Sequence, residues 1–250
     1  MIVDDIYKNN DKKILIKRNM RSRGILSMRS SIMNFNSNKK IGIIAEFKRR
    51  SPSGFVNNEN TDIFKYYDVI HNSIAGMSIL TEERYFNGNQ MDVVSVQRYN
   101  IPILIKDFVS NDEMIESSYM IGGDVILLIA DFLERDKIEM LNRKIKSLGM
   151  EALIEFHDLK AFERITTDEN VIIGYNRRNL KTLKIEDESF DAHDLIRSTG
   201  LLSVLESGIT SENILKMPRY NAMLIGSSIL SNDSVLKSAG MIKYDGFGYS

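Results

Sequence analysis

The sequence predicts a single (β/α)8 barrel preceded by a helical extension, and three observations support this fold class. Short apolar runs occur eight times after residue 40, and their starts lie 20 to 33 residues apart. The runs are continuous rather than alternating, which is typical of parallel strands covered by helices on both faces. The segments between them are long enough for crossover helices, and a length of 250 residues suits one such barrel.

The elements after residue 40 are predicted from these runs and from the signals that border them. A helix is expected over Asn111–Ile121, which opens with a capping Asn and two acidic residues in its first turn. A second helix is expected over Arg135–Leu148, because Lys144 and Lys146 lie in its last turn and Gly149 follows. The eight predicted strands are Ile41–Glu46, Ile74–Leu80, Ile101–Ile105, Asp124–Ala130, Glu151–Phe156, Val171–Asn176, Leu201–Glu206 and Asn221–Gly226.

Residues 1–40 differ from the rest, since they are rich in Lys, Arg, Asn and Ser. Two weakly amphipathic stretches, Ile6–Met20 and Ile25–Phe35, predict helices that pack on the barrel of residues 41–250, so that one domain results. We interpret the basic residues as a solvated helix face rather than an RNA or anionic surface, because no aromatic residues are interleaved with them. They are Lys12, Lys13, Lys17, Arg18, Arg21, Arg23 and Arg29.

Composition excludes several classes of protein. The chain has no Cys, so it can hold neither disulfides nor Cys-ligated zinc or iron–sulfur centres. Its net charge of -1 argues against nucleic acid as its main partner. The first five residues do not resemble a signal peptide, and no apolar run approaches the ~20 residues of a membrane span. His71, His157 and His193 lack metal-ligand spacing, so we expect no metal. Together with the charge and the apolar runs, this leads us to expect a cytoplasmic protein with no nucleic-acid or membrane partner.

Charged residues follow the apolar runs at the ends where a barrel gathers its active groups. Glu46 and Lys48 lie on one face of the first strand, and Lys106, Glu155 and Glu206 end later ones. Ammonium and carboxylate groups in a dry barrel mouth suit general acid–base catalysis. The alternative is a structural salt-bridge network, because such networks also place charges inside barrels.

The last two loops carry glycine and serine directly after strands, as barrel phosphate sites do. Ser207-Gly208 and Gly226-Ser227-Ser228 could bring backbone N–H groups to an anion. Ser51-Pro52-Ser53-Gly54, after the first strand, could close the site with hydroxyl groups. The alternatives are an ordinary helix cap and an ordinary turn.

Eight motifs in order along residues 40–230 resemble the indole-3-glycerol phosphate synthase family. They are IIAEFKRRSPSG (43–54), ILTEERYFNG (79–88), PILIKDF (102–108), DVILLIA (124–130), LIEFHD (153–158), IIGYNRRNL (172–180), ESGI (206–209) and LIGSSIL (224–230). The resemblance implies a barrel with an N-terminal helical segment. It also implies conversion of 1-(2-carboxyphenylamino)-1-deoxyribulose 5-phosphate to indole-3-glycerol phosphate, with loss of carbon dioxide and water, without a cofactor.

The same resemblance implies roles for the charged residues. Lys106 matches the acid that activates the substrate ketone, and Lys48 matches the lysine that pairs with the substrate carboxylate. Glu155 matches the base for dehydration, and Glu46 matches a second glutamate in this proton transfer. Which lysine and which glutamate act in which step stays open, because coupled charges titrate as a set.

Further positions match residues that hold the substrate. Asn176 and Glu206 match groups on the sugar hydroxyls, and Ser207 matches a residue near the anthranilate carboxylate. The positions that match the phosphate site are Ser53, Arg178, Gly208, Gly226 and Ser227. The positions expected to wall the aromatic ring, with ordinary core packing as the alternative, are Phe86, Phe108, Leu127 and Ile209.

The sequence departs from the family pattern at two places. Leu205 stands where a small residue is usual, so we expect it to reshape the pocket beside Glu206. Asp131 introduces an acid near the barrel mouth.

The expected partner is a small phosphosugar substrate, and the expected assembly is a monomer or weak homo-oligomer, with contact to other tryptophan-pathway enzymes left open. Two other functions stay open at this point. One is another phosphosugar enzyme, such as the phosphoribosylanthranilate isomerase type, which the lysines and glutamates disfavour. The other is a non-catalytic barrel that binds or assembles.

Overall fold

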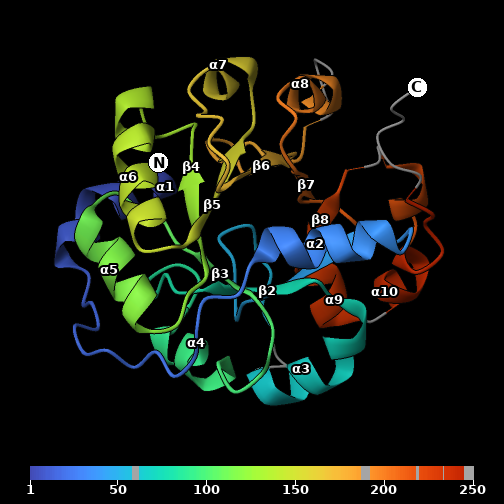
Figure 1. Ribbon diagram of the computed structural model, residues 1–250, viewed down its shortest axis with the longest axis horizontal. Helices are drawn as coiled ribbons and strands as arrows, with labels where there is room; N and C mark the ends of the chain where they lie inside the picture. The colour runs from blue at the N-terminus through green and yellow to red at the C-terminus, as the bar shows by residue number, and fades with distance from the viewer. Residues whose placement is uncertain (58–61, 187–191, 218–219, 233, 245–250) are drawn as a thin grey trace.

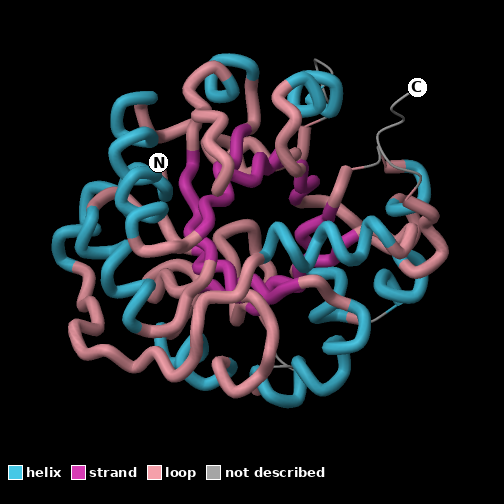
Figure 2. Tube along the Cα trace, in the orientation of Figure 1, coloured by secondary structure: helices cyan, strands magenta, loops and turns pink. Residues whose placement is uncertain are grey.

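The computed structural model describes residues 1–57, 62–186, 192–217, 220–232 and 234–244, and its core is a closed barrel of eight parallel strands (Figure 1). The strands pair in chain order and the last pairs with the first, so the predicted fold class is confirmed. Figure 2 shows them as a ring surrounded by helices. They are β1 Gly42–Phe47, β2 Gly76–Leu80, β3 Ile103–Lys106, β4 Val125–Ile129, β5 Glu151–Phe156, β6 Val171–Asn176, β7 Ser203–Glu206 and β8 Ala222–Ile225.

Helices follow the strands and cover the outside of the barrel (Figure 1). The two helices predicted after residue 40 are present, as α5 Asp112–Met120 and α6 Arg135–Ser147. Asn111 caps α5 by accepting a hydrogen bond from the N–H of Met114 at 3.0 Å. The remaining helices that follow the strands are α3 Ile63–Ile70, α4 Gln90–Val96, α7 Leu159–Phe162, α8 Ala192–Ser198, α9 Ser227–Ser231 and α10 Ser234–Ala239.

Side chains alternate along each strand between the barrel interior and the layer under the helices. In β7, Val204 packs inside the barrel, Leu205 packs in the outer layer, and Glu206 again lies inside. The expectation that Leu205 reshapes the pocket is therefore wrong, because its side chain belongs to the sheet–helix core.

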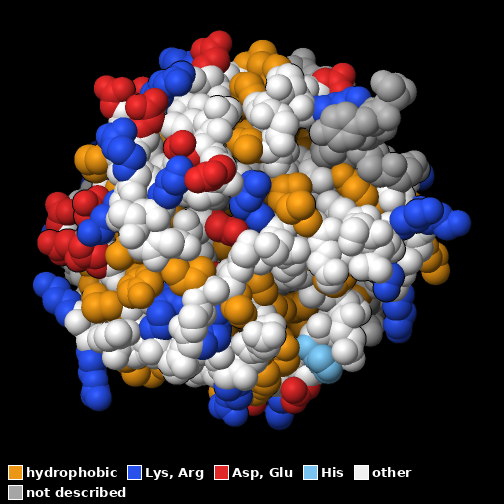
Figure 3. Space-filling model, in the orientation of Figure 1, with side chains coloured by type: hydrophobic (Ala, Val, Ile, Leu, Met, Phe, Trp, Pro, Cys, Tyr) orange, Lys and Arg blue, Asp and Glu red, His pale blue; other side chains and the backbone are white. Residues whose placement is uncertain are grey.

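The two helices of the N-terminal extension lie at opposite ends of the barrel. In α1, Ile2–Asn9, Ile2 and Val3 line a cavity at the carboxyl ends of the strands. In α2, Met28–Ser37, Met28 and Ile32 pack at the amino ends, where Met28 contacts Gly76 of β2. Figure 3 shows the face on which α2 lies, where acidic and basic side chains are interspersed.

An extended strap, residues 13–27, connects these helices, so the predicted helix over Ile6–Met20 is wrong beyond residue 12. Two glutamines of the barrel's helical layer bind the strap's backbone in place of helical hydrogen bonds. Gln90 donates to the carbonyl of Ile14 at 2.8 Å, and Gln97 accepts from the N–H of Ser22 at 2.8 Å. Because tertiary partners satisfy these groups, the weak helical periodicity does not decide the conformation.

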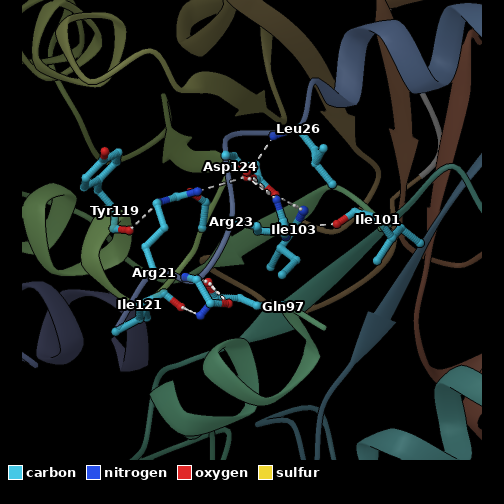
Figure 4. Close-up of polar contacts among 12 residues, drawn as sticks. Arg21, Arg23, Leu26, Gln97, Ile101, Ile103, Tyr119, Ile121 and Asp124 are labelled. Carbon is cyan, nitrogen blue, oxygen red and sulfur yellow. Dashed lines mark hydrogen bonds and ion pairs between the residues drawn. The ribbon is translucent and has the colours of Figure 1, made fainter. Parts of the chain in front are cut away.

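The expectation of a solvated basic face is wrong for four of the basic residues, including Arg29, which is half-buried and donates to the carbonyl of Val171 at 2.8 Å. Arg21 and Arg23 converge on Asp124 (Figure 4), and Lys13 pairs with Asp107. Other basic residues of the segment, among them Lys12, are exposed as expected. No helix among the described residues combines the length and apolar character needed to cross a bilayer.

Candidate active site

A cavity of about 320 Å³ opens at the carboxyl ends of the strands. Every site residue predicted from the sequence lines it, so the fold brings together residues spread over most of the chain. These residues are Glu46, Lys48, Ser53, Phe86, Lys106, Phe108, Leu127, Glu155, Asn176, Arg178, Glu206, Ser207, Gly208, Ile209, Gly226 and Ser227. Their location is established by this geometry, whereas their roles stay predictions.

Lys106 forms the centre of a charge network across the barrel. Its Nζ donates to Oε2 of Glu155 at 2.9 Å and to Oε2 of Glu206 at 2.6 Å. Nδ2 of Asn176 donates to Oε1 of Glu155 at 3.4 Å. Both glutamate side chains are 2% exposed, so the network is shielded from water and its charges interact strongly.

Glu46, on β1, and Lys48, directly after this strand, form a second ion pair at the edge of this network. Two glycines make room for the carboxylates. A Cβ at Gly226 would collide with Oε1 of Glu46, and one at Gly174 would collide with Oε1 of Glu206. Gly226 is among the residues predicted for the phosphate site, whereas Gly174 is not predicted, because its only signal is a glycine inside an apolar run.

The network separates the pKa values of its members. Burial disfavours a charge on Lys106, but Glu155 and Glu206 outweigh it and raise its pKa. Burial also opposes ionisation of Glu46, yet Lys48 and Lys106 hold its pKa below the ordinary value. For Glu206, burial dominates over Lys106 and, with Glu155 alongside, raises the pKa to about 8. A charged ammonium thus lies beside a carboxyl group that keeps its proton at neutral pH.

The pKa of Glu206 predicts a pH-dependent folding stability. The folded state holds this proton at pH values where the unfolded chain, titrating near the ordinary value of 4.5, has lost it. The free energy of unfolding therefore falls as pH rises from about 4.5 to about 8. Asp131 acts in the same direction only up to about 6, so above that value Glu206 contributes without Asp131. We expect urea denaturation to give a lower free energy of unfolding at pH 8 than at pH 6, and Glu206→Gln to remove most of this difference; an unchanged difference would contradict the assignment.

The end of the cavity formed by the last loops has the geometry expected of an anion site. Ser207 and Gly208 adopt φ values of +70° and +68°, a turn in which glycine is favoured and serine is uncommon. Gly226 precedes the first residue of α9, and no side chain caps its N-terminus. Arg178 brings a guanidinium group to this end and donates to the carbonyl of Leu183 at 2.6 Å.

Apolar side chains also line the cavity, and they include residues that sequence reasoning missed. Phe86 and Phe108 lie with ring centroids 6.0 Å apart. The missed apolar residues include Ile2 and Val3 on α1 and Leu180 and Leu183 on the loop after β6. The strands contribute four more, Leu80, Ile129, Leu224 and Ile225. Leucines in a polar loop directly after Arg178 were a usable signal, whereas nothing near the N-terminus indicated that α1 reaches the cavity.

Asp131 does not line the cavity but lies behind it. Its Oδ2 accepts from the N–H of His157 at 3.0 Å, and burial together with Glu155 raises its pKa to about 6. Nδ1 of His157 lies 2.8 Å from the carbonyl of Asn176. Over the described ranges, no cluster of three or more His, Asp or Glu residues is arranged to hold a metal ion.

Comparisons with known proteins agree with this geometry. A model of the indole-3-glycerol phosphate synthase family matches residues 6–241. The indole-3-glycerol phosphate synthase of Picrophilus torridus is 99% identical over 250 residues, which cover 100% of both chains. That of Thermoplasma acidophilum is 40% identical over 239 residues, covering 95% of this chain and 97% of the relative.

Solved structures extend the comparison of folds. The 3-keto-L-gulonate-6-phosphate decarboxylase of Vibrio cholerae superimposes with a TM-score of 0.56 at 12% identity, covering 81% of this chain and 99% of that one. At such low identity, the similarity concerns the fold alone.

Proposed function

The chain belongs to the indole-3-glycerol phosphate synthase family, and we propose that Lys106, Glu155, Glu46 and Lys48 carry out the acid–base steps of its reaction. The enzyme converts 1-(2-carboxyphenylamino)-1-deoxyribulose 5-phosphate to indole-3-glycerol phosphate, releasing carbon dioxide and water. The observation that carries the proposal is the ammonium group of Lys106, bound to two buried carboxyl groups inside the cavity.

The two ends of the cavity differ in a way that orients this substrate. The apolar side chains of Phe86, Phe108 and Leu127 suit the benzene ring, and Ile209, predicted for the same wall, directly follows the Ser207-Gly208 turn. The phosphate would lie at the other end, near Arg178 and the glycine and serine turns, with Ser53 closing the site. The ketone and the sugar hydroxyls then fall between them, beside Lys106 and within reach of Asn176 and Glu206.

Ring closure needs an acid at the ketone oxygen. The ring carbon that bears the carboxylate attacks the ketone carbon, and Lys106 donates a proton to the oxygen as the new bond forms. Lys48 pairs with the carboxylate before carbon dioxide leaves, and Ser207 lies near the same group. Loss of carbon dioxide restores the aromatic electrons, so these residues need only hold the reacting atoms and supply one proton.

Dehydration then needs a base and an acid at neighbouring atoms. Glu155 removes a proton from the carbon next to the amine, while a lysine ammonium group protonates the departing hydroxyl. The hydrogen bond from Asn176 keeps Glu155 oriented, and the Glu46–Lys48 pair returns protons to the network. Because Lys106 contacts both Glu155 and Glu206, it can recover its proton within the site.

No specific observation favours either alternative function, the isomerase type or the non-catalytic barrel. The family match and the lysine–glutamate network do not fit an isomerase, and a non-catalytic barrel does not require buried charges in its cavity. The absence of a cofactor, the oligomeric state, contact with other pathway enzymes and a cytoplasmic location stay predictions.

A direct assay tests the function. We expect the purified protein to convert the carboxyphenylamino substrate to a product with indole fluorescence. The chain has no Trp, so its own emission comes from Tyr and the product signal stands out. Added inorganic phosphate should raise the KM without changing kcat, because it competes for one end of the cavity. Absence of product would overturn the function, and noncompetitive inhibition would overturn the placement of the phosphate.

A further inference from the structure

The segment that carries Lys106 and Phe108 is bound on its outer side by the N-terminal extension. The carboxylate of Asp107 is 4% exposed and accepts from three donors. Its Oδ1 accepts from the N–H of Phe108 at 2.9 Å, and its Oδ2 accepts from Nζ of Lys13 and from Oγ1 of Thr81. This carboxylate thus joins the strap to the segment that follows β3.

Neighbouring backbone groups are fixed by the same elements. The N–H of Thr81 donates to the carbonyl of Lys106 at 3.2 Å, and Nζ of Lys13 donates to the carbonyl of Thr81 at 3.3 Å. Nδ2 of Asn10 donates to the carbonyl of Phe108 at 2.7 Å. The segment from Lys106 to Phe108 is therefore held on both sides of Asp107, within a few ångströms of the reacting groups.

Lys13 stabilises the buried carboxylate of Asp107 by pairing with it. Its side chain is 12% exposed, and it is the cation that pairs with Asp107. An ionised carboxylate shielded from water is stable only when it is paired and hydrogen-bonded. Without Lys13, the carboxylate of Asp107 would lose its counter-charge in a buried place, and a turn of the side chain toward water would disturb its bond to the N–H of Phe108.

We propose that Lys13 and Asp107 are positioning residues that set the placement of Lys106 and Phe108 for ring closure. The inference rests on the proposed roles of those two residues. Neither Lys13 nor Asp107 donates a proton to the substrate. Their effect is on the distance between the Lys106 ammonium group and the ketone oxygen, where an error of about 1 Å can cost up to about 10²-fold in rate.

Lys13→Met tests the proposal without removing the strap, since Gln90 and Gln97 bind the strap's backbone independently. We expect kcat to fall about 10- to 100-fold, with a smaller change in KM because the phosphate end is untouched. The matched control is Lys12→Met. Lys12 is exposed, and within the part of the chain that the structure describes its side chain bonds its neighbour Asn9 alone, so kcat should stay at the wild-type value.

A second variant separates positioning from folding. Asp107→Asn keeps an oxygen for the N–H of Phe108 but removes the charge that Lys13 pairs with. Both single variants and the double variant are assayed well below the Tm of each. If the two residues act as one unit, the double variant is no slower than the slower single variant.

Three outcomes would overturn the inference. The first is a wild-type kcat in folded Lys13→Met, and the second is a wild-type kcat in Asp107→Asn if Lys13→Met does not fold. The third is multiplication of the two losses in the double variant, which would mean that the residues act independently. A wild-type protein that makes no product would instead overturn the proposed function, so the two failures are distinguishable.

Discussion

Replacing Lys106 with Ala is expected to lower kcat about 10³-fold, because general acid catalysis is worth about 10²- to 10⁴-fold. The other lysine of the cavity, Lys48, pairs with Glu46 and not with Glu155 or Glu206, so it does not take the place of the Lys106 ammonium group. Substrate binding should survive better than turnover, because the apolar wall and the phosphate end remain. The variant should therefore show a large loss in kcat and a smaller change in KM, measured by product fluorescence.

The same substitution changes the electrostatics of the network. Without the ammonium group, the carboxyl groups of Glu155 and Glu206 face each other with no cation between them. Protonation relieves this repulsion, so the variant should be more stable at pH 6 than at pH 8.

Circular dichroism at pH 6 checks that the barrel is intact. Lys160→Ala, at an exposed lysine outside the cavity, is the matched control and should keep full activity. A folded Lys106→Ala enzyme with a kcat near that of the wild type would exclude Lys106 as the acid.

The barrel and its inward-facing charges could be predicted because local patterns specify them. An apolar run followed by a charged residue marks a strand end, and alternation along the strand places Glu46, Lys106, Glu155 and Glu206 on one side of the sheet. The closed topology then brings the four together without further information.

The contacts of the strap could not be predicted in this way. Lys13 and Asp107 are 94 residues apart, and Arg23 and Asp124 are 101 residues apart. Each cation lies in a polar, basic segment whose composition is typical of solvent-exposed chain. Asp107 follows one apolar run and Asp124 precedes another, and nothing in the neighbouring sequence indicates the partner of either acid. The weak helical periodicity up to Met20 also predicted the wrong conformation, since the strap's backbone is satisfied by glutamines from other elements. Local patterns therefore predict the strands and the charges inside them, but they do not predict long-range ion pairs.

Asp124 holds the second of these long-range pairs, and Asp124→Asn is expected to cost about 3–5 kcal/mol of folding stability. The side chain is fully buried at the start of β4 (Figure 4). Arg23 binds it through both terminal nitrogens, at 3.1 and 2.7 Å. The N–H groups of Leu26 and Ile103 donate to it at 3.1 and 2.9 Å, and Arg21 adds a longer contact at 3.5 Å. An asparagine at this position can accept on only one side, so its amide N–H groups would face existing donors.

The loss should exceed that of an ordinary ion pair because two guanidinium groups lose their counter-charge in a buried place. Urea denaturation followed by circular dichroism measures it. The matched control is Glu116→Gln, which breaks an ion pair with Lys144 on the surface and should cost at most about 1 kcal/mol. If both variants lose the same small amount, the Asp124 cluster contributes no more than a surface pair. A loss confined to Asp124→Asn would instead mean that this cluster fastens the strap to the barrel, between the helix at the cavity and the helix at the opposite end.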